Sequence, residues 1–163
     1  MSRRVGMDGA DLRILGALQQ DAMLSVAALS ERVHLSHNSC WRRLKRLEEA
    51  GVIARRVTLL NPQRLGLRLT AYMSVRTSEH SEQWLAGFAR AVAAIPAITE
   101  LYRMTGDVDY LLKLHVASMA DYDAVYRKLI ALVKLTDVST AFVMEEIKHT
   151  TELPLAVHAP EEG

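Results

Sequence analysis

The stretch LSHNSCWRRLKRLEEAGVI, residues 35–53, has the pattern of one amphipathic helix that ends at a glycine. Three of its residues recur at the spacing that places them on one side of a helix, facing a core: Cys40, Leu44 and Leu47. Ser36 is a good N-cap, and Gly51 stands where a glycine commonly ends a helix. The sequence therefore predicts a helix over residues 37–50.

The opposite side of this predicted helix is basic and begins with small polar residues. No acidic residue occurs between His37 and Leu47, and Trp41 flanks the basic side. Arginine pairs with guanine edges, asparagine pairs with adenine, and lysine and arginine both bind phosphate. The predicted DNA contacts are Ser36, His37, Asn38, Ser39, Arg42, Arg43, Lys45 and Arg46. The alternative is an ordinary solvated basic face, because such faces are common.

Two shorter helices are predicted before this one. Asp8 or Asp11 can cap the first, Ser25 can cap the second, and a three-residue turn separates the second from the third. Three helices with a tight turn before the third are typical of a helix-turn-helix. Residues 52–60 are expected to form a short strand pair or an extended arm that resembles a wing. We therefore assign residues 1–60 to a winged helix-turn-helix domain.

Residues 61–68 contain turn-forming residues, including Asn61-Pro62 and Gly66, and predict a linker. Beyond the linker, the apolar pattern predicts strands at 69–76, 98–104, 110–116 and 138–147, with helices at 81–94 and from 118. This β-α-β-β-α-β order is typical of a ferredoxin-like domain. The expected fold class is α+β, with a second domain over residues 69–163 that includes a short C-terminal tail.

The formal net charge of +1 over 163 residues conceals a division between the two parts. Residues 1–60 carry ten Lys or Arg and six Asp or Glu, whereas residues 61–163 carry ten and thirteen. A basic first part suits a polyanionic partner, and the acidic second part indicates a different one.

Several classes of protein are excluded by the sequence. The single cysteine excludes an internal disulfide framework and fits a reducing cytoplasm. No stretch approaches the roughly 18 apolar residues of a membrane span, and no signal peptide is expected. His34, His37 and Cys40 recur every three residues, but Cys40 lies on the predicted core face, so no metal site is expected. The sequence contains neither a phosphate-binding loop nor a nucleophile paired with a base, so no motif in it points to an enzyme.

The segment MTGDVDYLL, residues 104–112, is the most distinctive part of the second domain. Gly106 permits backbone conformations that other residues disfavour, and Asp107 and Asp109 place two carboxylates beside it. Carboxylates can hold an ammonium group, and free N–H groups at a turn can hold a carboxylate. Glycine and aspartate are also typical of a tight hairpin turn, and the chemistry alone favours that interpretation.

From Asp8 to about Pro154, the chain resembles the Lrp/AsnC (feast/famine) family of bacterial and archaeal transcriptional regulators. Residues 35–53, followed by LLNPQRLG, resemble its DNA-binding signature, and TGDVDYLLK and FVMEEIKHT resemble its effector domain, often called the RAM domain. Recognition helices of the family commonly open with prolines near the positions of His37 and Ser39. Their absence here puts any transfer of a specific operator sequence in doubt.

The resemblance implies a dimer that is built mainly by the RAM sheets. It implies that such dimers join into tetramers, octamers or larger rings, and that they bind promoter DNA. It also implies a free amino acid as effector, without a cofactor, and reverses the preference for a simple turn. The implied effector contacts are Met104, Thr105, Gly106, Asp107, Asp109, Tyr110, Met119, Phe142 and Val143. Met119 and the stretch from Phe142 would come from a facing subunit. The aliphatic lining leans toward leucine or methionine.

Two alternatives stay open at this point. Sirohaem decarboxylases have a similar two-part architecture, and a tetrapyrrole site would need a cleft histidine such as His115. An architectural DNA-binding protein would have the same fold without an effector. We expect a non-enzymatic, amino-acid-responsive regulator in the cytoplasm, associated with the nucleoid. Effector identity, target genes, activation or repression, and final oligomeric state do not follow from the sequence.

Overall fold

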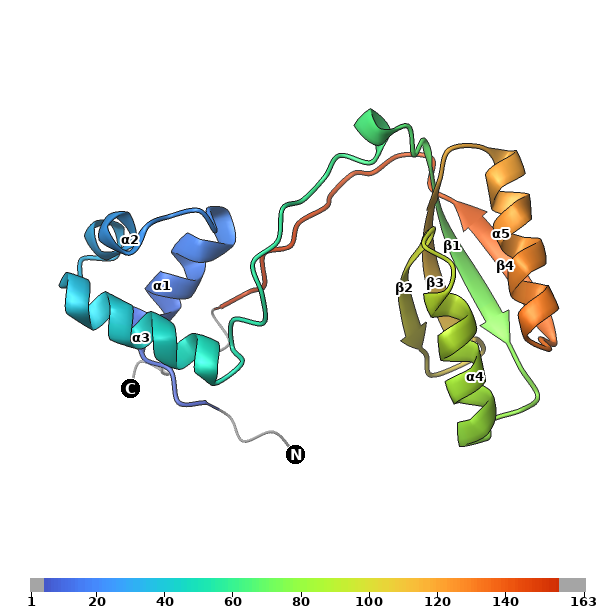
Figure 1. The fold of residues 1–163 in the computed structure, drawn as a ribbon, viewed down its shortest axis with the longest axis horizontal. Coiled ribbons are helices and arrows are strands. Elements are labelled where there is room, and N and C mark those ends of the chain that lie inside the picture. Colours follow the sequence, from blue (N-terminus) through green and yellow to red (C-terminus); the bar gives the residue numbers. More distant parts are fainter. Residues whose placement is uncertain (1–4, 156–163) are drawn as a thin grey trace. The chain divides into compact units, whose positions relative to one another are not determined.

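The computed structural model describes residues 5–155 and divides into two compact units. Among the described residues, the first unit contains residues 5–59 and 148–155, and the second contains Leu60–Ile147. Figure 1 shows helices alone in the first unit and a sheet with helices in the second. The sequence assigned the segment from 148 to the second domain, whereas the structure groups it with the first unit. No helix among the described residues is long and apolar enough to cross a bilayer.

The first unit contains α1 (Gly9–Gln20), α2 (Val26–Arg32) and α3 (His37–Glu49). Each helix begins at a residue whose side chain accepts backbone N–H groups of the first turn: Asp8, Ser25 and Ser36. Gly51 follows α3 with a φ of +70°, a conformation that glycine adopts without strain. The predicted helix-turn-helix and its caps are confirmed.

The core of the first unit lies where the three helices meet. Its fully buried residues include Ile14, Leu29, Cys40 and Leu47, so the predicted inner face of α3 is confirmed. Leu155 packs against this cluster, and the backbone of Leu153 exchanges two hydrogen bonds with the Gln19 side chain. The C-terminal segment therefore helps to cover α1.

The segment after α3 is an extended arm and not a strand pair. Residues 54–61 form no strand, and several of their apolar side chains are more than half exposed: Val57, Leu59 and Leu60. The alternating pattern that favoured strands is present, but no strand of the described chain pairs with these residues.

The second unit is a four-stranded antiparallel sheet with two helices, in the predicted order. Its elements are β1 (Leu69–Arg76), α4 (Glu82–Ala93), β2 (Ile98–Arg103), β3 (Tyr110–Val116), α5 (Met119–Leu132) and β4 (Asp137–Phe142). The strands lie in the order β2-β3-β1-β4, which is the ferredoxin-like arrangement, and all neighbours are antiparallel. A single-turn helix, Gln63–Leu65, precedes β1.

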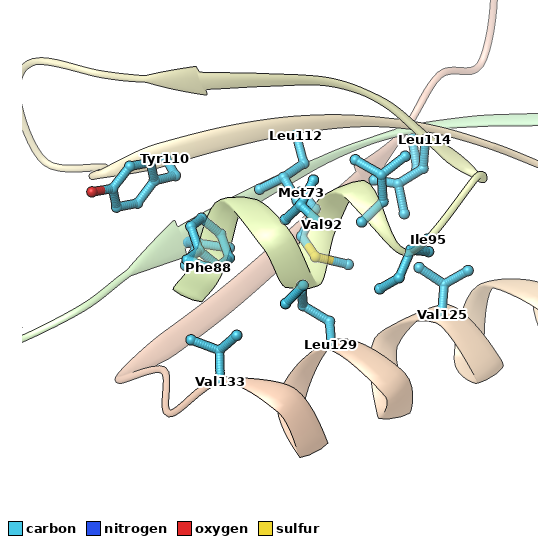
Figure 2. Packing of buried hydrophobic residues seen from close by; sticks show 14 of the residues in the cluster. Met73, Phe88, Val92, Ile95, Tyr110, Leu112, Leu114, Val125, Leu129 and Val133 are labelled. Atoms are coloured by element: carbon cyan, nitrogen blue, oxygen red, sulfur yellow. The ribbon is translucent and has the colours of Figure 1, made fainter. Parts of the chain in front are cut away.

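One face of the sheet packs on α4 and α5 to form the core in Figure 2. Alternate residues of the central strands are buried there, among them Met73 and Leu112, while Phe88 and Leu129 come from the two helices. The opposite face carries half-exposed side chains, including Tyr72, for which no element of this unit supplies a cover. The second unit therefore has one closed and one open sheet face.

The last strand is shorter than predicted. It ends at Phe142 and not at residue 147. The Val143 N–H still donates to the Thr70 carbonyl at 2.9 Å, but β1 begins at Leu69 and offers no partner further on. Met144 and Ile147 are accordingly almost fully exposed.

Candidate nucleic-acid interface and effector site

The surface of α3 carries most of the predicted DNA contacts. Asn38, Arg42 and Lys45 are exposed, and Arg42 forms no ion pair within residues 5–155. His37 is exposed as well. The Ser36 hydroxyl accepts the backbone N–H of Ser39 at 3.3 Å, so the Ser36 side chain serves first to begin the helix.

Arg43 and Arg46 lie on the side of α3 that faces α1. The Arg43 Nη1 atom is 2.7 Å from Oδ2 of Asp8 and 2.9 Å from Oδ1 of Asp11. Arg46 Nη2 contacts the second oxygen of Asp11, whose side chain is only 1% exposed. Two helices of the DNA-binding unit are thus tied together by four charged side chains, which we call the Asp8–Asp11 clamp.

Electrostatics within the Asp8–Asp11 clamp follow from this geometry. The pKa of Asp8 is lowered to about 2, because its carboxylate accepts the Asp11 backbone N–H and then the Arg43 guanidinium. Hydrogen bonds from Arg43 to Asp11, and then to Asp8, raise the pKa of the guanidinium. The positive charge of Arg43 is therefore already balanced by the carboxylates of Asp8 and Asp11. Its Nε atom is buried and has no hydrogen-bond partner among the described residues.

Three of the arginines line a small hollow at the edge of α3. Arg42, Arg43 and Arg46, with Asp8, enclose about 240 Å³. Arg46 is half exposed and Arg42 is exposed, so both guanidinium groups are accessible from this hollow, while Arg43 is mostly enclosed. An anion at this edge would meet Arg42 and Arg46 first.

Trp41 is an exposed residue of α3 that was not among the predicted contacts. The indole of Trp41 is 52% exposed, and the Nζ atom of Lys45 lies 5.3 Å from its ring centroid. Its position beside the basic side follows from the helical spacing, but the predicted contacts were limited to polar side chains that pair with base edges or phosphate.

The turn of the predicted effector segment is built by Asp109. Its Oδ2 accepts the Thr77 N–H at 2.8 Å, and its carbonyl accepts the Met104 N–H at 2.8 Å. Gly106 has a φ of +102°, which side chains rarely tolerate. Thr105, Gly106 and Asp107 form the exposed tip. Asp109 is thus committed to closing the turn, whereas the Asp107 carboxylate has no partner within residues 5–155.

Tyr110 belongs to the core and not to the exposed turn. It is 3% exposed, and its ring lies 5.0 Å from that of Phe88 and 5.6 Å from that of Trp84, measured between centroids. Tyr110 was predicted to contact the effector, but in the single chain its side chain packs in the core.

The remaining effector residues lie at the other end of the sheet. Tyr110, directly after the turn, pairs with Val75, whereas Phe142 pairs with Ala71 on the same strand. Four strand residues extend about 13 Å. Met119 starts α5 just beyond β3, at the end where Phe142 and Val143 lie. One chain therefore does not bring together the two groups that the sequence assigned to one site.

Among residues 5–155, no three His, Cys, Asp or Glu side chains gather as a metal ion would require. His115 hydrogen-bonds through Nδ1 with Thr70 Oγ1 at 3.1 Å on the open sheet face.

Two family models match the chain, one for each part. Residues 7–54 match a winged helix-turn-helix DNA-binding model, and residues 70–153 match the Lrp/AsnC ligand binding domain. With the basic α3 surface and the four-stranded α+β unit, these matches define a DNA-binding regulator with a separate ligand-binding domain.

Relatives of the whole chain agree. The glutamate uptake regulatory protein of Zymomonas mobilis is 53% identical over 149 residues, 91% of each chain. The crystal structure of an AsnC family transcriptional regulator from Agrobacterium tumefaciens superposes with a TM-score of 0.89 at 50% identity, covering 93% of this chain and 99% of that one. A Neisseria meningitidis regulator in complex with L-methionine has a TM-score of 0.86 at 37% identity, covering 91% and 97%. The chain belongs to the Lrp/AsnC family of transcriptional regulators.

Proposed function

We propose that this regulator binds a free amino acid at a site completed by two copies of the chain. The observation that carries this proposal is the separation of the implied effector residues onto opposite ends of one sheet. A turn from one subunit and the Phe142 end of another would bring the two groups together. The likeness to a relative that holds L-methionine supports an amino acid as the ligand.

The turn offers the groups that a zwitterion needs. The Asp107 carboxylate would pair with the ammonium group, and exposed backbone N–H groups around Gly106 would receive the carboxylate. Met104 is 41% exposed beside them, and Met119 and Val143 would supply further aliphatic surface from the second copy. We propose leucine or methionine as the effector on this basis.

The open sheet face supports assembly between copies. Tyr72 and Tyr102 are exposed on it, and Lys113 and Glu100 pair there at 3.2 Å. A monomer would leave the aromatic side chains of this surface in water, so pairing of two sheets is favoured. We propose a dimer through this face, joined into tetramers or octamers.

On DNA, α3 would enter the major groove of double-stranded promoter DNA. Arg42 is exposed and has no ion-pair partner among the described residues, and the exposed Lys45 ammonium pairs with the exposed Glu49 carboxylate at 3.7 Å. The half-exposed Arg46 guanidinium lines the 240 Å³ hollow at the helix edge. We propose that these groups hold phosphate and guanine while Asn38 is available to adenine. Effector binding would favour one assembly over another through its different affinity for the two.

We also propose that this regulator has no catalytic activity and that it acts in the cytoplasm, associated with the nucleoid. The clamped helix-turn-helix and the Lrp/AsnC ligand-binding match support this assignment over a tetrapyrrole enzyme. Purified protein should be colourless and should shift promoter DNA, whereas a copurified tetrapyrrole absorbance band would contradict this part of the proposal.

Subunit complementation tests the shared effector site. Asp107→Ala and Val143→Asp each change one end of the sheet, and each alone should abolish the calorimetric response to leucine and methionine. Subunits exchanged at random between the two variants should regain about a quarter of the parent's binding sites. The matched control carries both substitutions on one chain and is exchanged with chains that carry Asp107→Ala alone, a mixture that should regain no site because every turn in it lacks Asp107. If the first mixture also regains none, the effector site is not shared between subunits.

A further inference from the structure

Two observations on α3 show which part of its surface is free. On the flank toward α1, Arg43 and Arg46 are held by Asp8 and Asp11. On the other flank, the Trp41 side chain is 52% exposed, although its neighbour Cys40 is fully buried. The accessible surface of the helix is therefore displaced away from Arg43 and toward Trp41.

Trp41 belongs to a continuous stripe on this accessible surface. Residues three and four positions apart adjoin on a helix, and the stripe consists of His37, Asn38, Trp41, Arg42 and Lys45. The Lys45 ammonium lies over the indole, 5.3 Å from the ring centroid, so the two side chains occupy the same patch. The indole is the large apolar group of an otherwise polar stripe.

Packing within the described unit does not account for this exposed indole. The α3 side of the core is complete with Cys40, Leu44 and Leu47, which are at most 8% exposed. A half-exposed indole on a polar helix face is available to an apolar group of a binding partner.

We propose that Trp41 is a specificity-determining residue that contacts the C5-methyl group of a thymine in the major groove. The thymine methyl is the apolar group that base pairs present at the floor of that groove. The proposal rests on entry of α3 into the groove, as put forward above. Lys45, held beside the ring, is placed to reach a neighbouring base or phosphate.

Replacement of thymine by deoxyuridine tests the contact, because it removes only the methyl group. The probe is a duplex selected by the full-length protein from a randomised library, with each thymine replaced in turn. At least one replacement should weaken binding by the parent about fourfold, as expected for one buried methyl group. Trp41→Ala should bind the thymine and deoxyuridine duplexes with equal affinity.

Arg42→Ala is the matched control from the same stripe. It should weaken binding to both duplexes and keep the parent's discrimination between them. If Arg42→Ala has no effect, α3 does not enter the groove. The proposed DNA contact of α3 and the proposed role of Trp41 are then both overturned. If Arg42→Ala weakens binding but Trp41→Ala keeps the discrimination, only the role of Trp41 is overturned.

Fluorescence provides a second readout on an intact chain. In a Trp84→Phe background, Trp41 becomes the sole tryptophan, and its emission should change on addition of the selected duplex. Emission that responds to protein concentration but not to the duplex would show that a second copy covers Trp41, which overturns the proposal.

Discussion

The carboxylate of Asp11 lies 2.9 Å from Nη1 of Arg43 while being 1% exposed, so a buried charge in α1 fixes the orientation of α3. Asp11 also closes the capping box of α1, because its Oδ2 accepts the Asp8 N–H at 3.0 Å. One side chain therefore begins the first helix and holds the third. The DNA-binding surface depends on a residue that is itself inaccessible to DNA.

Replacement of Asp11 by asparagine should destabilise the first unit. The guanidinium of Arg43 would lose one of its two charged partners, with Asp8 remaining, while staying mostly enclosed, at 26% exposure. We expect the free energy of unfolding to fall by about 2 kcal/mol, the usual effect of breaking a partly buried charged hydrogen bond. Urea unfolding followed by circular dichroism measures it. Glu49→Ala removes the exposed Lys45–Glu49 pair, 3.7 Å apart, and should change stability by less than about 0.5 kcal/mol. Equal effects of the two substitutions would contradict a structural role for the clamp.

Acid should weaken the clamp in a defined pH window. The pKa of Asp8 in the folded chain is about 2, below its ordinary value of 3.8, so folding favours the carboxylate. This contribution is complete above pH 3.8 and is lost as the pH falls toward 2. Asp8→Asn keeps a capping side chain but removes the titration. The stability difference between parent and variant should shrink across this window, and a difference that is independent of pH would refute the assignment.

The apolar alternation predicted β1 and β3 to the residue, since a strand covered on one face must bury every second side chain. The end of β4 could not be predicted in the same way, because it depends on where β1 begins and not on the pattern of β4 itself. Beyond Val143 the chain soon passes the start of β1 at Leu69 and has no strand of the described chain to pair with.

Part of the candidate site also followed from the sequence, as the helical spacing separated the buried Cys40 from the exposed Arg42. The ion pairing of Arg43 could not be predicted from the sequence, because its partner Asp11 lies 32 positions earlier. The helical spacing alone does not distinguish one cation of a basic face from another. The separation of Asp107 from Phe142 likewise depends on strand register, which a linear motif does not contain.

The two aspartates of the turn should behave differently when each is replaced by alanine. Asp107→Ala removes an exposed carboxylate and should abolish the effector response without lowering the melting temperature. Asp109→Ala leaves the Thr77 N–H without its acceptor and should cost about 1 kcal/mol of stability. Thermal unfolding with and without added leucine or methionine measures both effects. A stable Asp109→Ala variant together with a destabilised Asp107→Ala variant would reverse the assigned roles.

The salt dependence of DNA binding should distinguish the free arginine from the clamped one. Each phosphate neutralised by a cation contributes about 0.9 to the slope of log K against log salt concentration. Arg42 is exposed and unpaired within the described residues, so Arg42→Ala should reduce the magnitude of the slope by about one unit per bound subunit. Arg43 is already bonded to Asp8 and Asp11, so Arg43→Ala should leave the slope unchanged while lowering the unfolding midpoint. Fluorescence anisotropy with a labelled duplex over a salt series provides the slopes. A loss of slope in Arg43→Ala as large as that in Arg42→Ala would mean that the clamp opens on DNA and releases Arg43 to a phosphate.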